Sequence, residues 1–241
     1  MNERQAKLLK SIIHQYIKTA QPIGSGWLAE NFNFSAKGGS ASGGKISPAT
    51  IRNEMADLTN QGFLAQPYTS AGRIPTEKAY RYFVEHFLSK KCSNAAVKKF
   101  FKNIKNKKLN ETTIKEISKK VAEEASGLVV LAFSRNDFYY TGLSYLFGQP
   151  EFQQAQVVYS VSQVVDHLDE TMADIFDKIG DKTEIFLGRE NPFSELCSTI
   201  LIRFQLPKQK NYSLFGLLGP MRMDYERNLS MVNYIKELLT K

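Results

Sequence analysis

Cysteine is scarce in this chain: only Cys92 and Cys197 occur among its 241 residues. A disulfide framework or a zinc site needs closely spaced cysteines, or cysteines with histidines, and neither cysteine has such a neighbour. We therefore expect no disulfide and no cysteine-bound metal. This cysteine usage is typical of the reducing cell interior, so the chain is expected to be cytoplasmic.

Long hydrophobic runs are also missing. No apolar stretch approaches the ~20 residues that a membrane-spanning helix needs. The N-terminus, Met1-Asn2-Glu3-Arg4, runs directly into a charged amphipathic segment and lacks the apolar core of a signal peptide. Both features favour a soluble protein with no membrane partner.

The residue sets that catalysis requires are absent as well. The histidines His14, His86 and His167 are far apart, and no two have the spacing of metal ligands. No nucleophile with a nearby base and no glycine-rich phosphate loop occurs. The acidic residues between positions 166 and 181 fit the solvated face of a helix better than a catalytic carboxylate pair. We expect no enzyme, no catalytic residue, no metal and no cofactor.

Positive charge is in excess, and it is unevenly placed. The formal net charge is +8, of which residues 1–90 carry +5, residues 91–127 carry +6 and residues 128–241 carry −3. A basic front half followed by a mildly acidic back half predicts that an anionic partner, such as nucleic acid, binds near the N-terminus.

Residues 46–76 form the most informative segment. Ser47 is a good N-cap, and Pro48 suits the first position of a helix because its missing N–H is not needed there. Gly62 is placed to end this helix. Apolar residues recur at the helical period and predict one buried face: Ile51, Met55 and Leu58.

The opposite face of this helix carries small and polar side chains suited to a DNA groove. Arginine can pair with guanine and asparagine with adenine, and each good pair discriminates by about 1–3 kcal/mol. A basic hairpin at 66–73 follows, with Gly72 and Arg73 expected at its tip, and its polar groups can reach phosphates or the minor groove. Helix, turn and basic hairpin in this order are typical of a winged helix-turn-helix. The predicted DNA-binding residues are Ser47, Ala49, Thr50, Arg52, Asn53, Tyr68, Thr69, Ser70, Gly72 and Arg73.

Periodicity alone fits an ordinary amphipathic surface helix equally well, and the adjoining hairpin favours recognition. Around this segment we expect a first helix over 3–19, a short helix after Ser25, a flexible Gly/Ser/Lys loop at 35–45, and a helix over 77–88. Together these make residues 1–90 a DNA-binding domain. Residues 91–126 are interpreted as a helical linker, with lysines on a solvated face or, as the lesser alternative, against DNA: Lys98, Lys99, Lys102, Lys105, Lys107 and Lys108.

Residues 127–241 are predicted to form a second domain built on a sheet. Apolar or alternating segments at 128–133, 138–142, 183–188, 199–205 and 213–219 predict strands, and residues 164–179 and 224–239 predict helices. Strands with helices between and around them indicate an α/β or α+β domain. The polar residues at 190–191 and 222–224 are interpreted as an internal ion pair or a helix cap and not as a ligand site.

Several segments resemble the HrcA family of heat-inducible transcription repressors. In the first half they are Glu3-Arg4-Gln5, Pro22-Ile23-Gly24-Ser25, residues 47–58 and residues 66–76. In the second half they are residues 149–152, 187–191 and 216–225. The resemblance spans nearly the whole chain and is most specific over residues 47–76.

The resemblance implies an α+β protein with an N-terminal winged helix-turn-helix and a GAF-like α/β sheet domain over 127–241. It also implies a repressor of heat-shock chaperone operons that binds an inverted-repeat operator in double-stranded DNA as a homodimer. Such a repressor loses activity on heating, and the chaperonin GroEL helps to maintain its DNA-binding form. A GAF-like fold alone does not imply a ligand.

The chain departs from the family pattern in three places. The dimerising domain that family members carry inside the GAF-like domain is missing, since residues 133–138 join the flanking segments directly. The tract at 35–45 enlarges the loop between the second and third helices, and Gly26 stands where the family usually has Arg. The missing insert leaves the mode of dimerisation open. Two alternative functions also stay open: a ligand-sensing regulator whose C-terminal domain binds a small metabolite, and an RNA-binding winged helix.

Overall fold

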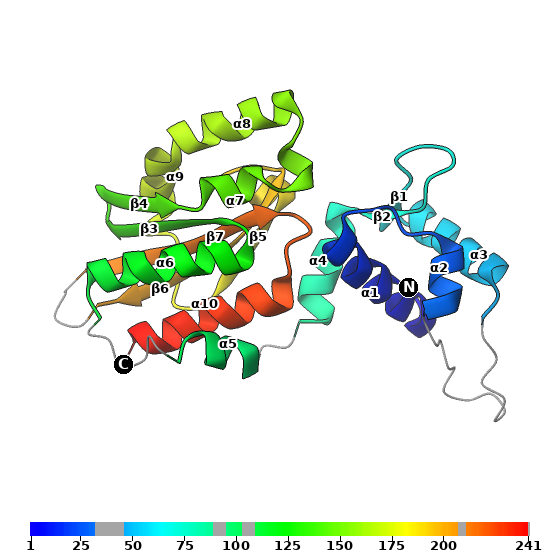
Figure 1. Ribbon diagram of the computed structural model, residues 1–241, viewed down its shortest axis with the longest axis horizontal. Coiled ribbons are helices and arrows are strands. Elements are labelled where there is room, and N and C mark those ends of the chain that lie inside the picture. The colour runs from blue at the N-terminus through cyan, green and yellow to red at the C-terminus, as the bar shows by residue number, and fades with distance from the viewer. Residues whose placement is uncertain (32–45, 89–94, 103–108, 207–210, 241) are drawn as a thin grey trace. The chain divides into compact units, whose positions relative to one another are not determined.

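The computed structural model describes residues 1–31, 46–88, 95–102, 109–206 and 211–240. The chain divides into two units, Met1–Leu88 and Ser89–Lys241, coloured blue to cyan and green to red in Figure 1. The tract at 35–45, Cys92 and the lysines at 105, 107 and 108 lie outside the described residues.

The first unit begins with α1 (Glu3–Thr19), whose bounds agree with those expected from its apolar stripe. Asn2 caps this helix: its side chain accepts a hydrogen bond from Gln5 N (2.8 Å), and Gln5 Oε1 accepts one from Asn2 N (3.2 Å). This reciprocal pair is a capping box, which fixes the start of the helix. The helices α2 (Ser25–Asn31), α3 (Pro48–Asn60) and α4 (Glu77–His86) follow. The buried core of the unit includes Leu8, Leu9, Ile12, Leu28, Ile51, Leu58 and Phe83.

A short antiparallel hairpin lies between α3 and α4. Its strands are β1 (Leu64–Ala65) and β2 (Ile74–Pro75), paired Leu64 to Pro75 and Ala65 to Ile74. Ile23, just before α2, forms an isolated bridge with Arg73, and both backbone hydrogen bonds of this bridge measure 2.9 Å. The base of the hairpin is therefore joined on one side to the segment between α1 and α2.

The second unit is built on one antiparallel sheet. Its strands are β3 (Leu128–Ser134), β4 (Asp137–Thr141), β5 (Glu184–Leu187), β6 (Cys197–Gln205) and β7 (Tyr212–Pro220), in the order β4-β3-β7-β6-β5. The five predicted strand segments therefore coincide with the observed strands to within a few residues. Because every neighbouring pair in the described sheet is antiparallel, the unit is α+β and not a parallel α/β sheet.

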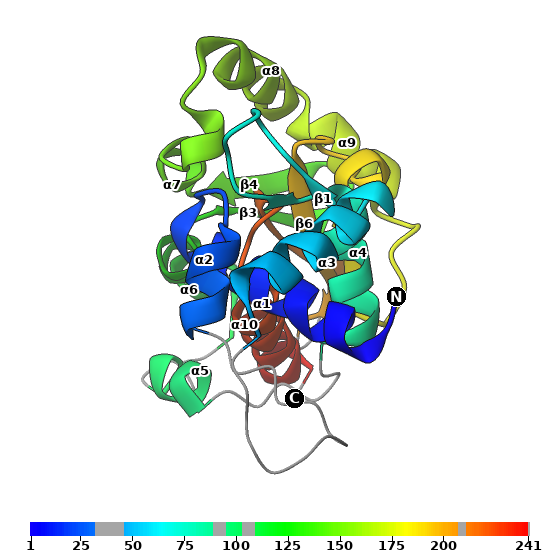
Figure 2. The same ribbon diagram turned by 90° about the vertical axis from the view of Figure 1, so that its right-hand side faces the viewer.

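Helices cover both faces of this sheet. On one face α6 (Glu111–Ala125) contacts β3 and α10 (Tyr225–Leu239) contacts β6, with α5 (Ala95–Phe100) against α10. The opposite face packs on α7 (Leu143–Phe147), the 3-10 turn η1 (Pro150–Phe152), α8 (Ala155–Asp166) and α9 (Leu168–Ile175). Figure 1 and Figure 2 both show α10 on the side of the sheet away from α8 and α9. Alternate residues of β3 enter the core on the α7–α9 side: Leu128, Val130 and Ala132.

The expected single helix over 164–179 is wrong. The chain forms α8, which begins nine residues earlier, and α9, which ends at Ile175. The two helices are separated by His167, whose φ of −113° and ψ of 17° are not helical. The start of α8 was missed because valine has a higher intrinsic preference for strands than for helices. In the folded unit Val161 is buried on the helix, and this packing overrides the intrinsic preference.

The described parts of residues 91–126, interpreted from the sequence as a helical linker, group with the second unit. Phe101 is fully buried, and its ring stacks on Tyr234 of α10 with 5.0 Å between centroids. Ile114 and Ile117 of α6 are buried as well. These apolar residues are evident in the sequence, but no local pattern indicates which helix Phe101 contacts.

Candidate nucleic-acid interface

The helix α3 has one buried and one exposed side, as its period predicted. Ser47 caps it by accepting a hydrogen bond from Thr50 N (3.1 Å), and Gly62 follows its end with a φ of +77°, a conformation that favours glycine. The buried side consists of Ile51, Glu54, Met55 and Leu58. The predicted contact residues Ser47, Ala49, Arg52 and Asn53 are exposed, and Thr50 is half-buried.

An ion pair holds α3 against α1. Arg4 on α1 pairs with Glu54 on α3, and the Glu54 side chain is only 10% exposed. A carboxylate with so little access to water requires a partner, so this pair fixes the position of α3 in the unit. Within the described residues, Arg52 and Asn53 form no side-chain hydrogen bond or ion pair. No other described residue therefore competes with a ligand for their polar groups.

The tip of the hairpin is an exposed polar loop. Tyr68 is 64% exposed, and Thr69 and Ser70 are exposed beside it. The backbone turns here, with Ala71 N donating to Tyr68 O (2.9 Å). In the part of the chain that the structure describes, the hydroxyl groups of Tyr68, Thr69 and Ser70 make no hydrogen bond to protein. These three hydroxyls are available to acceptors or donors outside the chain.

Gly72 and Arg73 lie at the base of the hairpin, whereas the sequence placed them at its tip. A Cβ on Gly72 would lie 2.4 Å from the Ile23 carbonyl oxygen, so only glycine fits this close approach of two backbones. Arg73 Nε donates to Thr59 Oγ1 at 3.1 Å. Arg73 therefore joins the hairpin to the C-terminal end of α3. Thr59 was missed because its partner is fourteen residues away and no local pattern indicates the contact.

Lys78 adds a positive charge near the end of α3. Its Nζ donates to Gln61 O (2.8 Å) and lies 4.7 Å from the centroid of the Phe63 ring. Lys98, Lys99 and Lys102, proposed from the sequence as lesser candidates, are exposed residues of the second unit.

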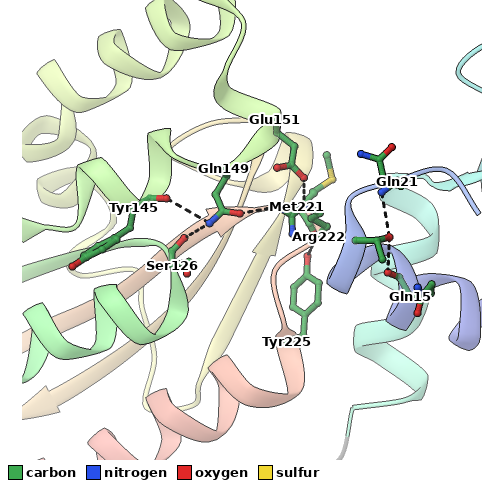
Figure 3. Close-up of polar contacts among 10 residues, drawn as sticks. Gln15, Gln21, Ser126, Tyr145, Gln149, Glu151, Met221, Arg222 and Tyr225 are labelled. Atoms are coloured by element: carbon green, nitrogen blue, oxygen red, sulfur yellow. Dashed lines mark hydrogen bonds and ion pairs between the residues drawn. The ribbon is translucent and has the colours of Figure 1, made fainter.

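In the second unit, Arg222 connects two segments that both carried the family resemblance. This side chain lies in the turn between β7 and α10, donates to Gln149 Oε1 (2.7 Å) and forms an ion pair with Glu151 (Figure 3). Gln149 Nε2 in turn donates to Ser126 O (2.9 Å). Asp224 caps α10 by accepting from Arg227 N (3.0 Å). Both roles expected for residues 222–224, an internal ion pair and a helix cap, are therefore present.

A pocket of about 340 Å³ opens between the sheet edge and the junction of α8 and α9. Its lining combines apolar and aromatic side chains with two carboxylates: Val130, Leu131, Phe138, Tyr139, Tyr140, Val165, Asp166, Leu168, Asp169 and Met172. The volume is at the lower end of the range for small-molecule sites. Among the described residues, no group of three or more His, Cys, Asp or Glu side chains is placed to hold a metal ion. Within the same residues, no helix is long and apolar enough to cross a membrane.

Cys197 is expected to be inert in the native protein. Burial raises the pKa of its thiol from 9.0 to about 12, and the side chain is 1% exposed. At pH 8 we expect labelling by an aromatic disulfide reagent to be at least about a hundredfold slower than in denaturant, because the thiolate reacts and it is hardly formed. A Cys92→Ser variant isolates this thiol. Rapid labelling of the native protein would contradict the prediction.

Comparison with known proteins places the chain in a family. The model described as HrcA protein C terminal domain matches residues 69–229, which is more than half of the chain. A heat-inducible transcription repressor HrcA of Alkaliphilus metalliredigens is 51% identical over 88 residues, which are 36% of this chain and 23% of that protein. The one of Thermodesulfovibrio yellowstonii is 24% identical over 352 aligned positions, covering 100% of this chain and 97% of that protein.

The second relative is longer than this chain. Because the alignment has 352 positions and the chain has 241 residues, more than a hundred positions of the relative have no counterpart here. A crystal structure of a hypothetical protein has the same fold, with a TM-score of 0.73 at 18% identity over 100% of this chain and 98% of that one. From the family match over residues 69–229, the chain belongs to the HrcA family.

Proposed function

We propose that the chain is a sequence-specific transcription repressor that binds double-stranded DNA through its first unit, acting as a winged helix-turn-helix. The observation that carries this proposal is the exposed polar side of α3 beside an exposed hairpin in a basic unit. The family supports it, since the relatives are named heat-inducible transcription repressors and not enzymes. The antiparallel sheet with helices on both faces is consistent with a GAF-like second domain.

In this proposal the two parts of the interface have different tasks. Arg52 and Asn53 read base edges in the major groove, while Ala49 and Thr50 approach thymine methyl groups. Ser47 and the tip residues Tyr68, Thr69 and Ser70 donate to phosphates, which sets the register of the protein on DNA. Gly72 and Arg73 complete the predicted set, and their position at the hairpin base makes them supports of the tip.

We further propose a homodimer on an inverted-repeat operator of chaperone genes. Heating would release it if the DNA-binding form is only marginally stable, and a folding helper such as GroEL would shift that balance. If purified protein keeps its operator affinity across the heat-shock range without chaperonin, the heat-release part of the proposal fails.

Selection of bound sites from random duplexes tests DNA recognition directly. Enrichment of an inverted repeat would support both sequence specificity and dimeric binding. Enrichment of a single half-site would leave specificity intact and contradict the dimer. Absence of any enriched sequence, or stronger binding to structured RNA in competition, would overturn the proposed function.

Gly26 offers a gain-of-function prediction. A Cβ at this exposed position on α2 would meet no atom within 4 Å, so Gly26→Arg should fold and restore the phosphate contact suggested by the family pattern. We expect a several-fold higher affinity at low salt and a salt dependence steeper by about 0.9 in log–log slope. Gly26→Ala is the control, because it adds helix propensity without charge. An equal effect of both variants would argue against a phosphate contact.

The pocket supports a second candidate, a ligand-sensing regulator. Its volume of about 340 Å³ and its mixed apolar and acidic lining would suit a small amphipathic molecule. A thermal-shift screen of metabolites at fixed DNA concentration separates the two candidates. A hit that also alters DNA affinity would favour ligand sensing, whereas a heat response in purified protein without any hit would favour the first proposal.

A further inference from the structure

Gln66 forms a brace across the loop that joins β1 and β2. Its side-chain Nε2 donates to two backbone carbonyls of the same loop, Thr69 O at 2.7 Å and Ala71 O at 3.1 Å. Ala71 N closes the loop from inside by donating to Tyr68 O at 2.9 Å. One amide group at the start of the loop therefore fixes the path of the backbone through the tip.

The tip has few other means of staying ordered. Tyr68 is 64% exposed, and residues 66–70 are all exposed, so no buried apolar contact holds them. Pro67 restricts its own φ, but the three residues after it have no such ring constraint. Fixing the backbone of each residue costs conformational free energy. The Gln66 amide offsets part of this cost before any ligand arrives.

We propose that Gln66 is a positioning residue for DNA binding, which holds the hairpin tip in the conformation that presents Tyr68, Thr69 and Ser70 to phosphates. This inference rests on the proposed function. Gln66 itself need not touch DNA, because both of its donor hydrogens are directed at loop carbonyls. Its effect is preorganisation: the ordering cost is met on folding and not on binding.

The chemistry of the brace is specific to glutamine. One amide nitrogen carries two hydrogens, which serve two carbonyls at once. An ionised glutamate has no donor and would repel both carbonyl oxygens, and asparagine is one methylene shorter. Gln66→Met therefore removes the two donors and keeps the length of the side chain.

The experiment compares Gln66→Met with wild type in the full chain. In the free protein, we expect exchange of the Ala71 amide hydrogen to accelerate about tenfold while the thermal midpoint is unchanged, since the loop is exposed. The operator dissociation constant should rise about fivefold to tenfold, as expected for the loss of two ordinary hydrogen bonds. Gln153→Met, at an exposed glutamine of the second unit, is the matched control and should have no effect.

A mutant cycle in which Tyr68, Thr69 and Ser70 are all replaced by alanine distinguishes positioning from a direct contact. If Gln66 acts through the tip, Gln66→Met should weaken binding by less than about twofold once these three contacts are removed. Additive losses, or faster exchange with unchanged DNA affinity, would overturn the positioning role. Unchanged exchange would overturn the brace itself. If wild-type protein binds no operator, the proposed function fails, and the exchange rates still show whether the brace exists.

Discussion

Replacing Arg52 and Asn53 together by alanine should weaken operator binding by at least about thirtyfold without lowering thermal stability. Both side chains are exposed on α3 and have no protein partner among the described residues, so their loss leaves nothing unpaired in the free protein. Each base contact of this kind is worth about 1–3 kcal/mol, so two together amount to at least about 2 kcal/mol, which is roughly a thirtyfold change in the dissociation constant. Electrophoretic or fluorescence titrations at one fixed salt concentration measure this loss.

The single variants should differ in what they change. Asn53→Ala is expected to relax specificity at one base position of each half-site, which a panel of operator variants reveals. Lys18→Ala at the end of α1 removes the same charge as Arg52→Ala, and Asn136→Ala removes the same group as Asn53→Ala from an exposed turn of the second unit. If these controls weaken binding as strongly as the α3 variants, α3 does not read the bases.

Gly72→Ala should destabilise the first unit by about 2–4 kcal/mol. The added Cβ would lie 2.4 Å, 2.5 Å and 2.8 Å from three backbone atoms of Ile23, and backbone cannot move aside as a flexible side chain does. The bridge between Ile23 and Arg73 would break, with the loss of two hydrogen bonds and added strain. For a unit of this size the unfolding midpoint should fall by roughly 10 °C or more. Operator affinity should fall with it, because the hairpin leaves its place beside α3.

Gly24→Ala provides the matched control. Gly24 is next to the same bridge, yet a Cβ there would meet no atom within 4 Å and its φ is not in the left-handed region. We expect a change of less than about 0.5 kcal/mol, as for most surface substitutions. Calorimetry of the two variants in parallel compares their unfolding midpoints. Equal midpoints would show that the close approach of Gly72 to Ile23 does not contribute to stability.

Features encoded by neighbouring residues were predictable from the sequence. The cap at Ser47, the buried side of α3 and the glycine after it depend on residues within about one helical turn of each other, and the structure has all three. The contacts that hold the hairpin in place were not predictable. Arg73 contacts Thr59 and Ile23, which are far from it in the chain, and no period or turn signal indicates such pairs.

The second unit shows the same division. Apolar runs revealed where its strands lie, but they carry no information on strand order, and β3 pairs with β7 across some eighty intervening residues. The ion pair of Arg222 with Glu151 could be anticipated only as an internal pair without a partner. The contact of Phe101, which follows the lysine-rich α5, with Tyr234 on α10 has no local signal either.

The turn between β3 and β4 is a position at which residues can be inserted without disturbing the sheet. It lies at 135–136, is exposed, and joins the edge strand of the sheet to its neighbour, while the order of the remaining strands is set by other pairings. Extra chain entering and leaving at such a turn adds only a slowly growing loop-closure cost and disturbs no buried contact. An added segment is therefore tolerated better at this turn than within a strand, and the residues on either side can still form the same sheet. The same turn is a natural place to insert a reporter module.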